Sequence, residues 1–186
     1  PDLALTLSLE AARISGEQPQ VYASVADAVY SNGTQRLLDV GDEFLFSVAL
    51  TQDGTVVAHG SNEGTLCLHD IPQDQRIICL EGHEARVTEL AFADGGSRLV
   101  SADGRGKLIW WDSDPESETF GTALAEYVYT DEEGETRFID SLALQDVALN
   151  NPVRVFFGTG DGQLGVWTPE GSGDVEFWET PHESPL

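Results

Sequence analysis

"EGHEARVTELAFADGGSRLVSADGRGKLIWWD", residues 81–112, is the stretch of sequence that decides the fold. Apolar and β-branched runs alternate in it with glycine-containing turns such as "ADGGS" and "ADGRG". No apolar stripe recurs at the 3.6-residue period of an amphipathic helix. We therefore predict short strands joined by tight turns, in which glycine supplies the positive φ.

The same pattern recurs along the chain. The final run "GKLIWWD" (106–112) has relatives in "GTQRLLD" (33–39), "GTLCLHD" (64–70) and "GQLGVWT" (162–168). The upstream turns keep the register, because Gly54 precedes Gly64 by the same interval as Gly96 precedes Gly106. A further apolar run follows, as in "QRIICLEGH". The repeating unit is therefore four short strands, and the predicted fold class is all-β.

With Gly82–His83 near its start and Trp111–Asp112 at its end, this stretch resembles a WD repeat. The step from Gly64 to Gly106 agrees with that family's period of about 40–45 residues. The resemblance implies a β-propeller of four-stranded antiparallel blades. We expect a poorly formed first blade at 1–40, a second at 41–81, a third at 82–143 with an acidic hairpin insertion at about 113–143, and a fourth at 144–186.

The number of blades in the sequence, about four, is compatible with more than one assembly. Propeller rings hold about four to eight blades, and those of this family mostly about seven. A blade buries its faces only against its neighbours, so an incomplete ring leaves apolar faces in water. We favour an incomplete ring of about four blades that is part of a longer protein. The alternatives are two copies that complete one ring by self-association, and a small closed ring.

Members of the WD-repeat family often brace each blade with a hydrogen-bonded set of His, Ser or Thr, Asp and Trp. In the third blade, Asp103 falls where the hydroxyl is expected and Arg105 where the Asp is expected, so we expect no blade to hold the complete set. His69 and Asp70 correspond to a degenerate Trp-Asp pair. The structural repeat positions implied by the resemblance are Ser61, His69, Asp70, His83, Trp111, Asp112, Thr159, Asp161 and Trp167.

Composition limits the partners. The 33 acidic residues against nine basic ones give a net charge of −24. Such a field repels nucleic acid and anionic lipid, so we expect neither a nucleic-acid nor a membrane partner. A lysine-poor acidic coat suits a halophilic source, with an ordinary acidic protein as the alternative. No run approaches the length of a membrane span, and we expect a cytoplasmic protein.

Catalytic and metal-binding motifs are absent from the sequence. There is no GxSxG, P-loop, HExxH or dinucleotide fingerprint, so we expect no enzyme activity and no cofactor. His59, Cys67 and His69 lack metal-ligand spacing and are expected to pack in the core. Cys67 and Cys79 lie symmetrically about a turn, where a cross-strand disulfide is an alternative, but we favour two reduced thiols.

These observations predict a non-catalytic scaffold that presents loops to protein partners. The alternative is the propeller portion of a larger enzyme or signalling protein whose catalytic domain lies outside this chain. The most distinctive surface segment is the acidic loop of Asp131, Glu132, Glu133 and Glu135. We expect a solvated surface loop here, and the alternative is that it contacts a basic partner.

Overall fold

The computed structural model describes residues 44–145, 152–170 and 173–178, and these residues form three antiparallel sheets of four strands each. Within each sheet the strands pair in chain order. The strands are β1 (Leu45–Leu50), β2 (Val56–Ser61), β3 (Leu66–Asp70) and β4 (Gln75–Leu80); β5 (Val87–Ala93), β6 (Arg98–Asp103), β7 (Lys107–Asp112) and β8 (Ala123–Val128); β9 (Ile139–Gln145), β10 (Arg154–Thr159), β11 (Leu164–Trp167) and β12 (Val175–Trp178). A single 3-10 turn, η1 (Asp94–Gly96), joins β5 to β6.

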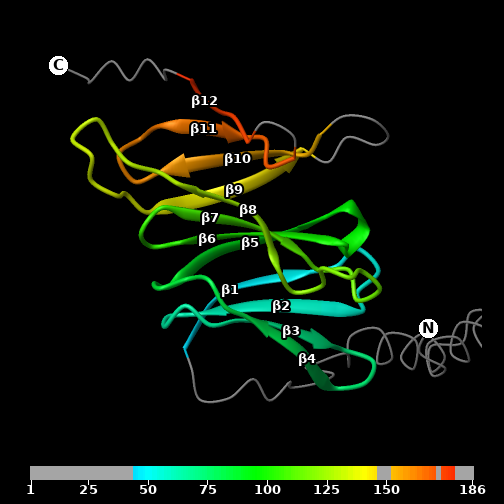
Figure 1. Ribbon diagram of the computed structural model, residues 1–186. Helices are drawn as coiled ribbons and strands as arrows, with labels where there is room; N and C mark the ends of the chain where they lie inside the picture. Colours follow the sequence, from blue (N-terminus) through cyan, green and yellow to red (C-terminus); the bar gives the residue numbers. More distant parts are fainter. Residues whose placement is uncertain (1–43, 146–151, 171–172, 179–186) are drawn as a thin grey trace, which may run out of the picture. The chain divides into compact units, whose positions relative to one another are not determined.

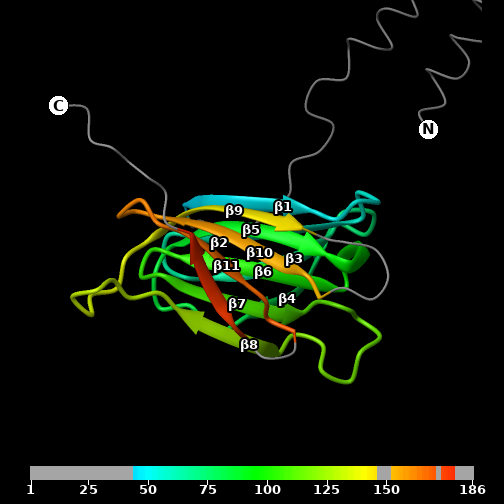
Figure 2. The same cartoon turned by 90° about the horizontal axis from the view of Figure 1, so that it is seen from above.

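The sheets of residues 41–186 lie face to face, with β5–β8 between the other two (Figure 1). The first strands β1, β5 and β9 lie side by side along one edge of the stack, and β4 and β8 lie toward the other (Figure 2). Sheets that pack this way around a common set of first strands have the arrangement of propeller blades. The prediction of an all-β fold made of four-stranded antiparallel blades is confirmed for the described residues.

Two apolar cores fill the spaces between the sheets. Trp111 and Ile109 on β7 face the β1–β4 sheet and meet Leu66 and Leu68. Trp110, which lies between Ile109 and Trp111 on β7, packs in the core shared with the β9–β12 sheet. Successive strand residues point to opposite faces, so a strand covered on both sides is apolar throughout. This explains the continuous run "LIWW" in the middle sheet.

The acidic segment differs from the prediction. An extended hairpin was expected within the third blade, but the strands on either side of the segment, β8 and β9, belong to different sheets. The turn between them carries an isolated bridge, Thr130 with Thr136, and no ladder that joins β8 to β9 in the described residues. The apolar alternation that suggested one hairpin belongs to the last strand of one sheet and the first strand of the next. The predicted first blade, 1–40, lies outside the described residues.

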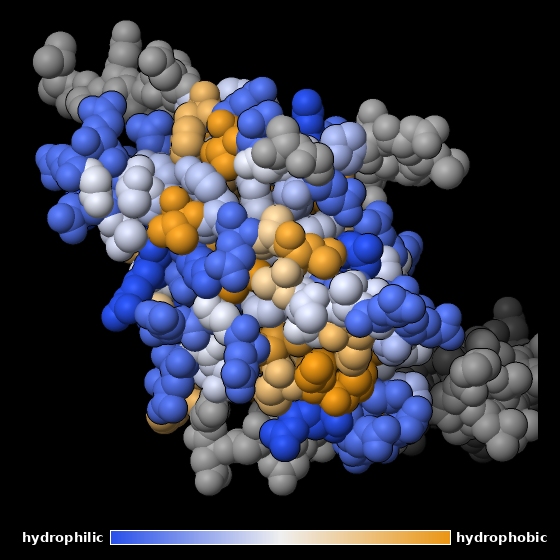
Figure 3. All heavy atoms as spheres, viewed as in Figure 1, coloured by the Kyte–Doolittle hydropathy of each residue, from blue (hydrophilic) through white to orange (hydrophobic). Residues whose placement is uncertain are grey.

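Figure 3 shows that apolar side chains gather in small patches within a largely hydrophilic surface on this face of the molecule. Among the residues that the structure describes, no helix has the length and apolarity needed to cross a membrane.

Candidate functional site

A buried chain of hydrogen bonds braces the middle sheet. The Ser101 hydroxyl oxygen accepts a bond from Trp111 Nε1 at 2.8 Å and lies 2.6 Å from His83 Nε2. His83 Nδ1 lies 2.9 Å from Asp103 Oδ2. For a neutral imidazole, Nδ1 donates to the carboxylate and Nε2 accepts the Ser101 proton, because an ionised carboxylate can only accept. The middle sheet therefore holds all four members of the set.

The prediction that no blade completes the set is wrong, and the error is a shift of two residues. β6 extends to Asp103, so the hydroxyl position is Ser101 and the carboxylate position is Asp103. Asp103 Oδ1 also accepts the backbone N–H groups of Arg105 at 2.9 Å and Lys107 at 3.0 Å. Burial raises the pKa of Asp103. These two bonds and the one from His83 lower the pKa by more than burial raises it, so the pKa of Asp103 lies below its usual value.

In the other two sheets, Ser61 and Thr159 occupy the position of Asp103 rather than that of Ser101. The Ser61 hydroxyl accepts backbone N–H groups across its turn at 3.1 and 3.2 Å, and Thr159 accepts the one from Gln163 at 3.0 Å. His59 and His69 take the Ser101 and Trp111 positions in the first sheet, with ring centroids 4.9 Å apart. These side chains therefore stabilise turns and strand contacts.

Trp167 takes the Trp111 position in the third sheet and is buried in the core. Asp161 does not join a set of this kind. It accepts hydrogen bonds from the Thr159 hydroxyl and, at 2.8 Å, from the Tyr129 hydroxyl. Burial and the bond to Asp161 raise the pKa of Tyr129 to about 12. Asp161 thus links the β10–β11 turn to the chain that follows β8.

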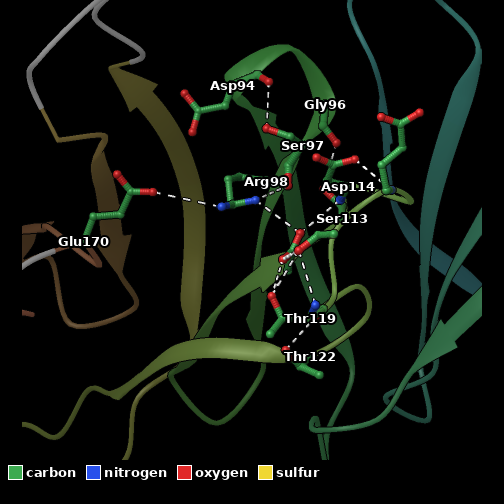
Figure 4. A network of polar contacts seen from close by, with 12 residues as sticks. Asp94, Gly96, Ser97, Arg98, Ser113, Asp114, Thr119, Thr122 and Glu170 are labelled. Carbon is green, nitrogen blue, oxygen red and sulfur yellow. Dashed lines mark hydrogen bonds and ion pairs between the residues drawn. The ribbon is translucent and has the colours of Figure 1, made fainter.

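Asp112 and Asp70 both end a strand, but their side chains have different hydrogen-bond partners. The Asp112 carboxylate, 1% exposed, accepts hydrogen bonds from the hydroxyls of Ser117 and Thr119 at 2.5 and 2.6 Å (Figure 4). It also accepts a bond from Arg98 at 3.1 Å. Burial raises the pKa of Asp112. These bonds and the charge of Arg98 lower the pKa by more than burial raises it, so the pKa of Asp112 lies below its usual value. Asp70 makes one turn contact, accepting the backbone N–H of Gln73 at 2.7 Å.

Cys67 and Cys79 form a disulfide, so the preference for reduced thiols is wrong. The two residues are direct partners in the β3–β4 register, which places both sulfur atoms on the same face of the sheet. The described residues contain no group of three or more His, Cys, Asp and Glu side chains arranged to hold a metal ion.

The acidic turn is built around Asp131. Its Oδ1 accepts the backbone N–H groups of Glu133 at 3.0 Å and Glu135 at 2.8 Å, and its Oδ2 accepts Nε of Arg137 at 2.6 Å. The bond from the Glu135 N–H is the main reason that the pKa of Asp131 is lowered. Asp131 is thus occupied within the turn, while the side chains of Glu132, Glu133 and Glu135 are exposed.

A pocket of about 730 Å³ lies beside this turn. The chain after β8 and the β10–β11 turn form its sides, and Phe177 of β12 supplies an aromatic surface. Tyr129 contacts that ring at a centroid distance of 5.4 Å. Glu132, Glu133 and Asp161 line it, and its arginine, Arg137, is paired with Asp131. The geometry therefore combines carboxylates with aromatic rings, a setting suited to a cationic side chain.

Sequence reasoning missed Ser101, Tyr129 and Arg137. Ser101 carried a usable signal, since it lies two residues before Asp103 in a strand whose end could have been counted from Gly106. Tyr129 and Arg137 carried none, because their partners are far along the chain or across a turn of unknown geometry.

Comparisons with known proteins agree with this geometry. Residues 74–112 match the family described as "WD domain, G-beta repeat". The chain is 37% identical over 81 residues to the B-type cell cycle switch protein ccs52A of Medicago truncatula, covering 43% of this chain and 16% of that protein. It is 26% identical over 124 residues to Topless-related protein 3 of Arabidopsis thaliana, covering 65% of this chain and 11% of that protein.

The fold resembles the β-propeller domain of Cps50 (Swd1) from Myceliophteria thermophila with a TM-score of 0.61. The sequences are 17% identical, and the match covers 75% of this chain and 39% of that one. This likeness shows the fold. The chain spans only 16% and 11% of the two sequence relatives, so it corresponds to a small part of either.

Proposed function

Since this chain belongs to the WD-repeat β-propeller family, we propose that it is a non-catalytic platform for protein partners. Propellers of this kind typically mediate protein interactions, and their stacked sheets hold the connecting loops in fixed positions. The activity of the chain is then recognition, with a few charged and aromatic anchors supplying most of the binding energy.

The acidic turn 131–135 is the proposed contact for a basic partner. The observation that supports this proposal is that some charged residues of the turn hold its backbone while others face solvent. Asp131 and Arg137 hold its backbone from inside, which leaves the carboxylates of Glu132, Glu133 and Glu135 exposed. A pre-formed loop loses little conformational entropy on binding, so less of the interaction energy is spent on ordering it. Its exposed carboxylates also attract an approaching cation.

Affinity capture from a lysate of the source organism tests the proposal. The full chain and its E132Q/E133Q/E135Q variant serve as baits, at low and at high salt. E63Q/E81Q/E84Q is the matched control, because it removes the same charge from exposed positions outside the acidic turn and outside the β7–β8 connection. We expect the wild type and the control to capture the same basic proteins in a salt-sensitive manner, and the turn variant to lose them. Equal capture by all three baits would refute this role for the turn.

A further inference from the structure

A second groove lies at the ends of the strands opposite the acidic turn, between the β1–β4 and β5–β8 sheets. It has a volume of about 300 Å³, within the range of ligand pockets. The β1–β2 turn forms one wall, and η1 with the β7–β8 connection forms the other. Its floor is apolar and consists of Val56, Leu68, Ile77 and Phe120.

The walls are fixed before anything binds. Gly96 of η1 lies so close to the β1–β2 turn that a Cβ there would meet Thr51 Cγ2 at 2.8 Å. The Ser113 hydroxyl donates to the Gly96 carbonyl at 2.8 Å, which ties the β7–β8 connection to η1. Farther along this connection, Ser117 and Thr119 are held by the buried Asp112 carboxylate (Figure 4).

Each wall contributes a carboxylate. Asp53 lies on the β1–β2 turn, where hydrogen bonds, above all from the Thr51 hydroxyl, lower its pKa. Asp114 lies on the opposite wall, and its Oδ1 accepts the Glu116 N–H at 2.9 Å. No lining residue is basic. The neighbouring Arg98 is turned away toward Asp112 and Glu170, so it does not neutralise the groove.

We propose that this groove docks an extended segment of a protein partner through an arginine or lysine side chain. The apolar stem of that side chain lies on Ile77 and Phe120, and its cationic head lies between Asp53 and Asp114. Long basic side chains bury their methylenes on apolar surface while the charge stays at a polar rim. The net charge of −24 favours a cationic occupant over an acidic one. This inference shares with the proposed function the premise that the chain binds proteins, but it concerns a different surface.

Backbone amide NMR of the full chain tests the groove, with the peptide acetyl-Ala-Arg-Ala-amide as the probe. The citrulline peptide is the control, because it has nearly the same shape without the charge. We expect saturable shifts at amides of the β1–β2 turn, η1 and residues 113–120 with the arginine peptide. Binding should weaken about fivefold with citrulline or in D53N/D114N, the loss expected for one or two exposed ion pairs.

Equal shifts with both peptides, shifts spread over the whole acidic surface, or unchanged binding in D53N/D114N would overturn the inference. The E132Q/E133Q/E135Q variant separates the two proposals. It should bind the arginine peptide in the groove like the wild type, even though it is expected to lose the partners of the acidic turn. If the groove fails while the turn still captures partners, only the groove inference is wrong.

Discussion

At the scale of single residues, Ser101 links Trp111 on β7 to His83, which precedes β5. Ser101 is 0% exposed, and its hydroxyl contacts both the indole of Trp111 and the imidazole of His83. A buried polar group that loses its partner costs free energy, because water cannot replace the bond. The stability of the sheet therefore depends on a side chain of small volume.

Replacing Ser101 with alanine should lower the free energy of unfolding by about 2–3 kcal/mol, because a buried donor and acceptor are left without a partner. The measurement is denaturant unfolding followed by tryptophan fluorescence. S141A is the control, since Ser141 is exposed on β9, and it should change stability by less than about 0.5 kcal/mol. Equal losses in the two variants would contradict the structural role assigned to Ser101.

Asp103 makes a prediction about pH. Its pKa is lowered in the folded protein, so folding favours the ionised form. The stabilisation is therefore present above the unfolded pKa of about 3.9 and is lost as pH falls through the folded pKa. D103N should be less stable than the wild type at neutral pH and should lose less stability on acidification below about pH 4. Urea unfolding across that range measures this, and E118Q should keep the wild-type pH dependence.

At the scale of elements, one five-residue turn recurs. A Ser, Asp or Thr side chain accepts backbone N–H groups across the turn, and a glycine with positive φ stands three residues after it. The same geometry recurs in the acidic turn, with Asp131 and Gly134 in these roles. Gly106 adds a second constraint, because the carbonyl oxygen of Arg137 lies too close to the position that a Cβ would take. That turn thus packs against the connection to the next sheet.

Alanine at Gly106 should be much more destabilising than alanine at Gly162, the equivalent position in the third sheet. Both have left-handed φ values, +80° and +88°, so both substitutions are strained. Only Gly106 also meets backbone atoms, whereas nothing lies within 4 Å of the Cβ position at Gly162. We expect G106A to cost about 2 kcal/mol more than G162A in chemical unfolding. Similar losses would mean that the backbone contact relaxes freely.

At the scale of the whole molecule, the stack presents an apolar face beyond β1. Val48 and Leu50 are 69% and 55% exposed. In the middle sheet their positions correspond to Leu90 and Phe92, which pack in the core against the preceding sheet. The face therefore has the composition of a contact between sheets, as expected for an incomplete ring. The alternative drawn from the sequence, in which a second copy of the chain covers this face, can be tested directly.

Light scattering in low and multimolar potassium chloride tests this alternative. Salt screens the repulsion caused by the net charge of −24, so the molar mass of the wild type should rise with salt. V48K/L50K should remain at lower mass because it places charges on the apolar face. L124K, at a 43% exposed position on β8, is the control and should associate like the wild type. A mass that is independent of salt in all three proteins would contradict self-association through β1.

The sequence by itself determined the class of fold and its repeating unit. Glycines at fixed intervals and strands without helical period leave few other solutions, because turn geometry and strand alternation are local properties. What only the tertiary structure decided are the pairings across strands and sheets. Ser101 between His83 and Trp111, Cys67 bonded to Cys79, Asp131 within its own turn, and the division of 123–145 between two sheets all depend on register. A shift of one or two residues changes every such partner while leaving the local pattern intact.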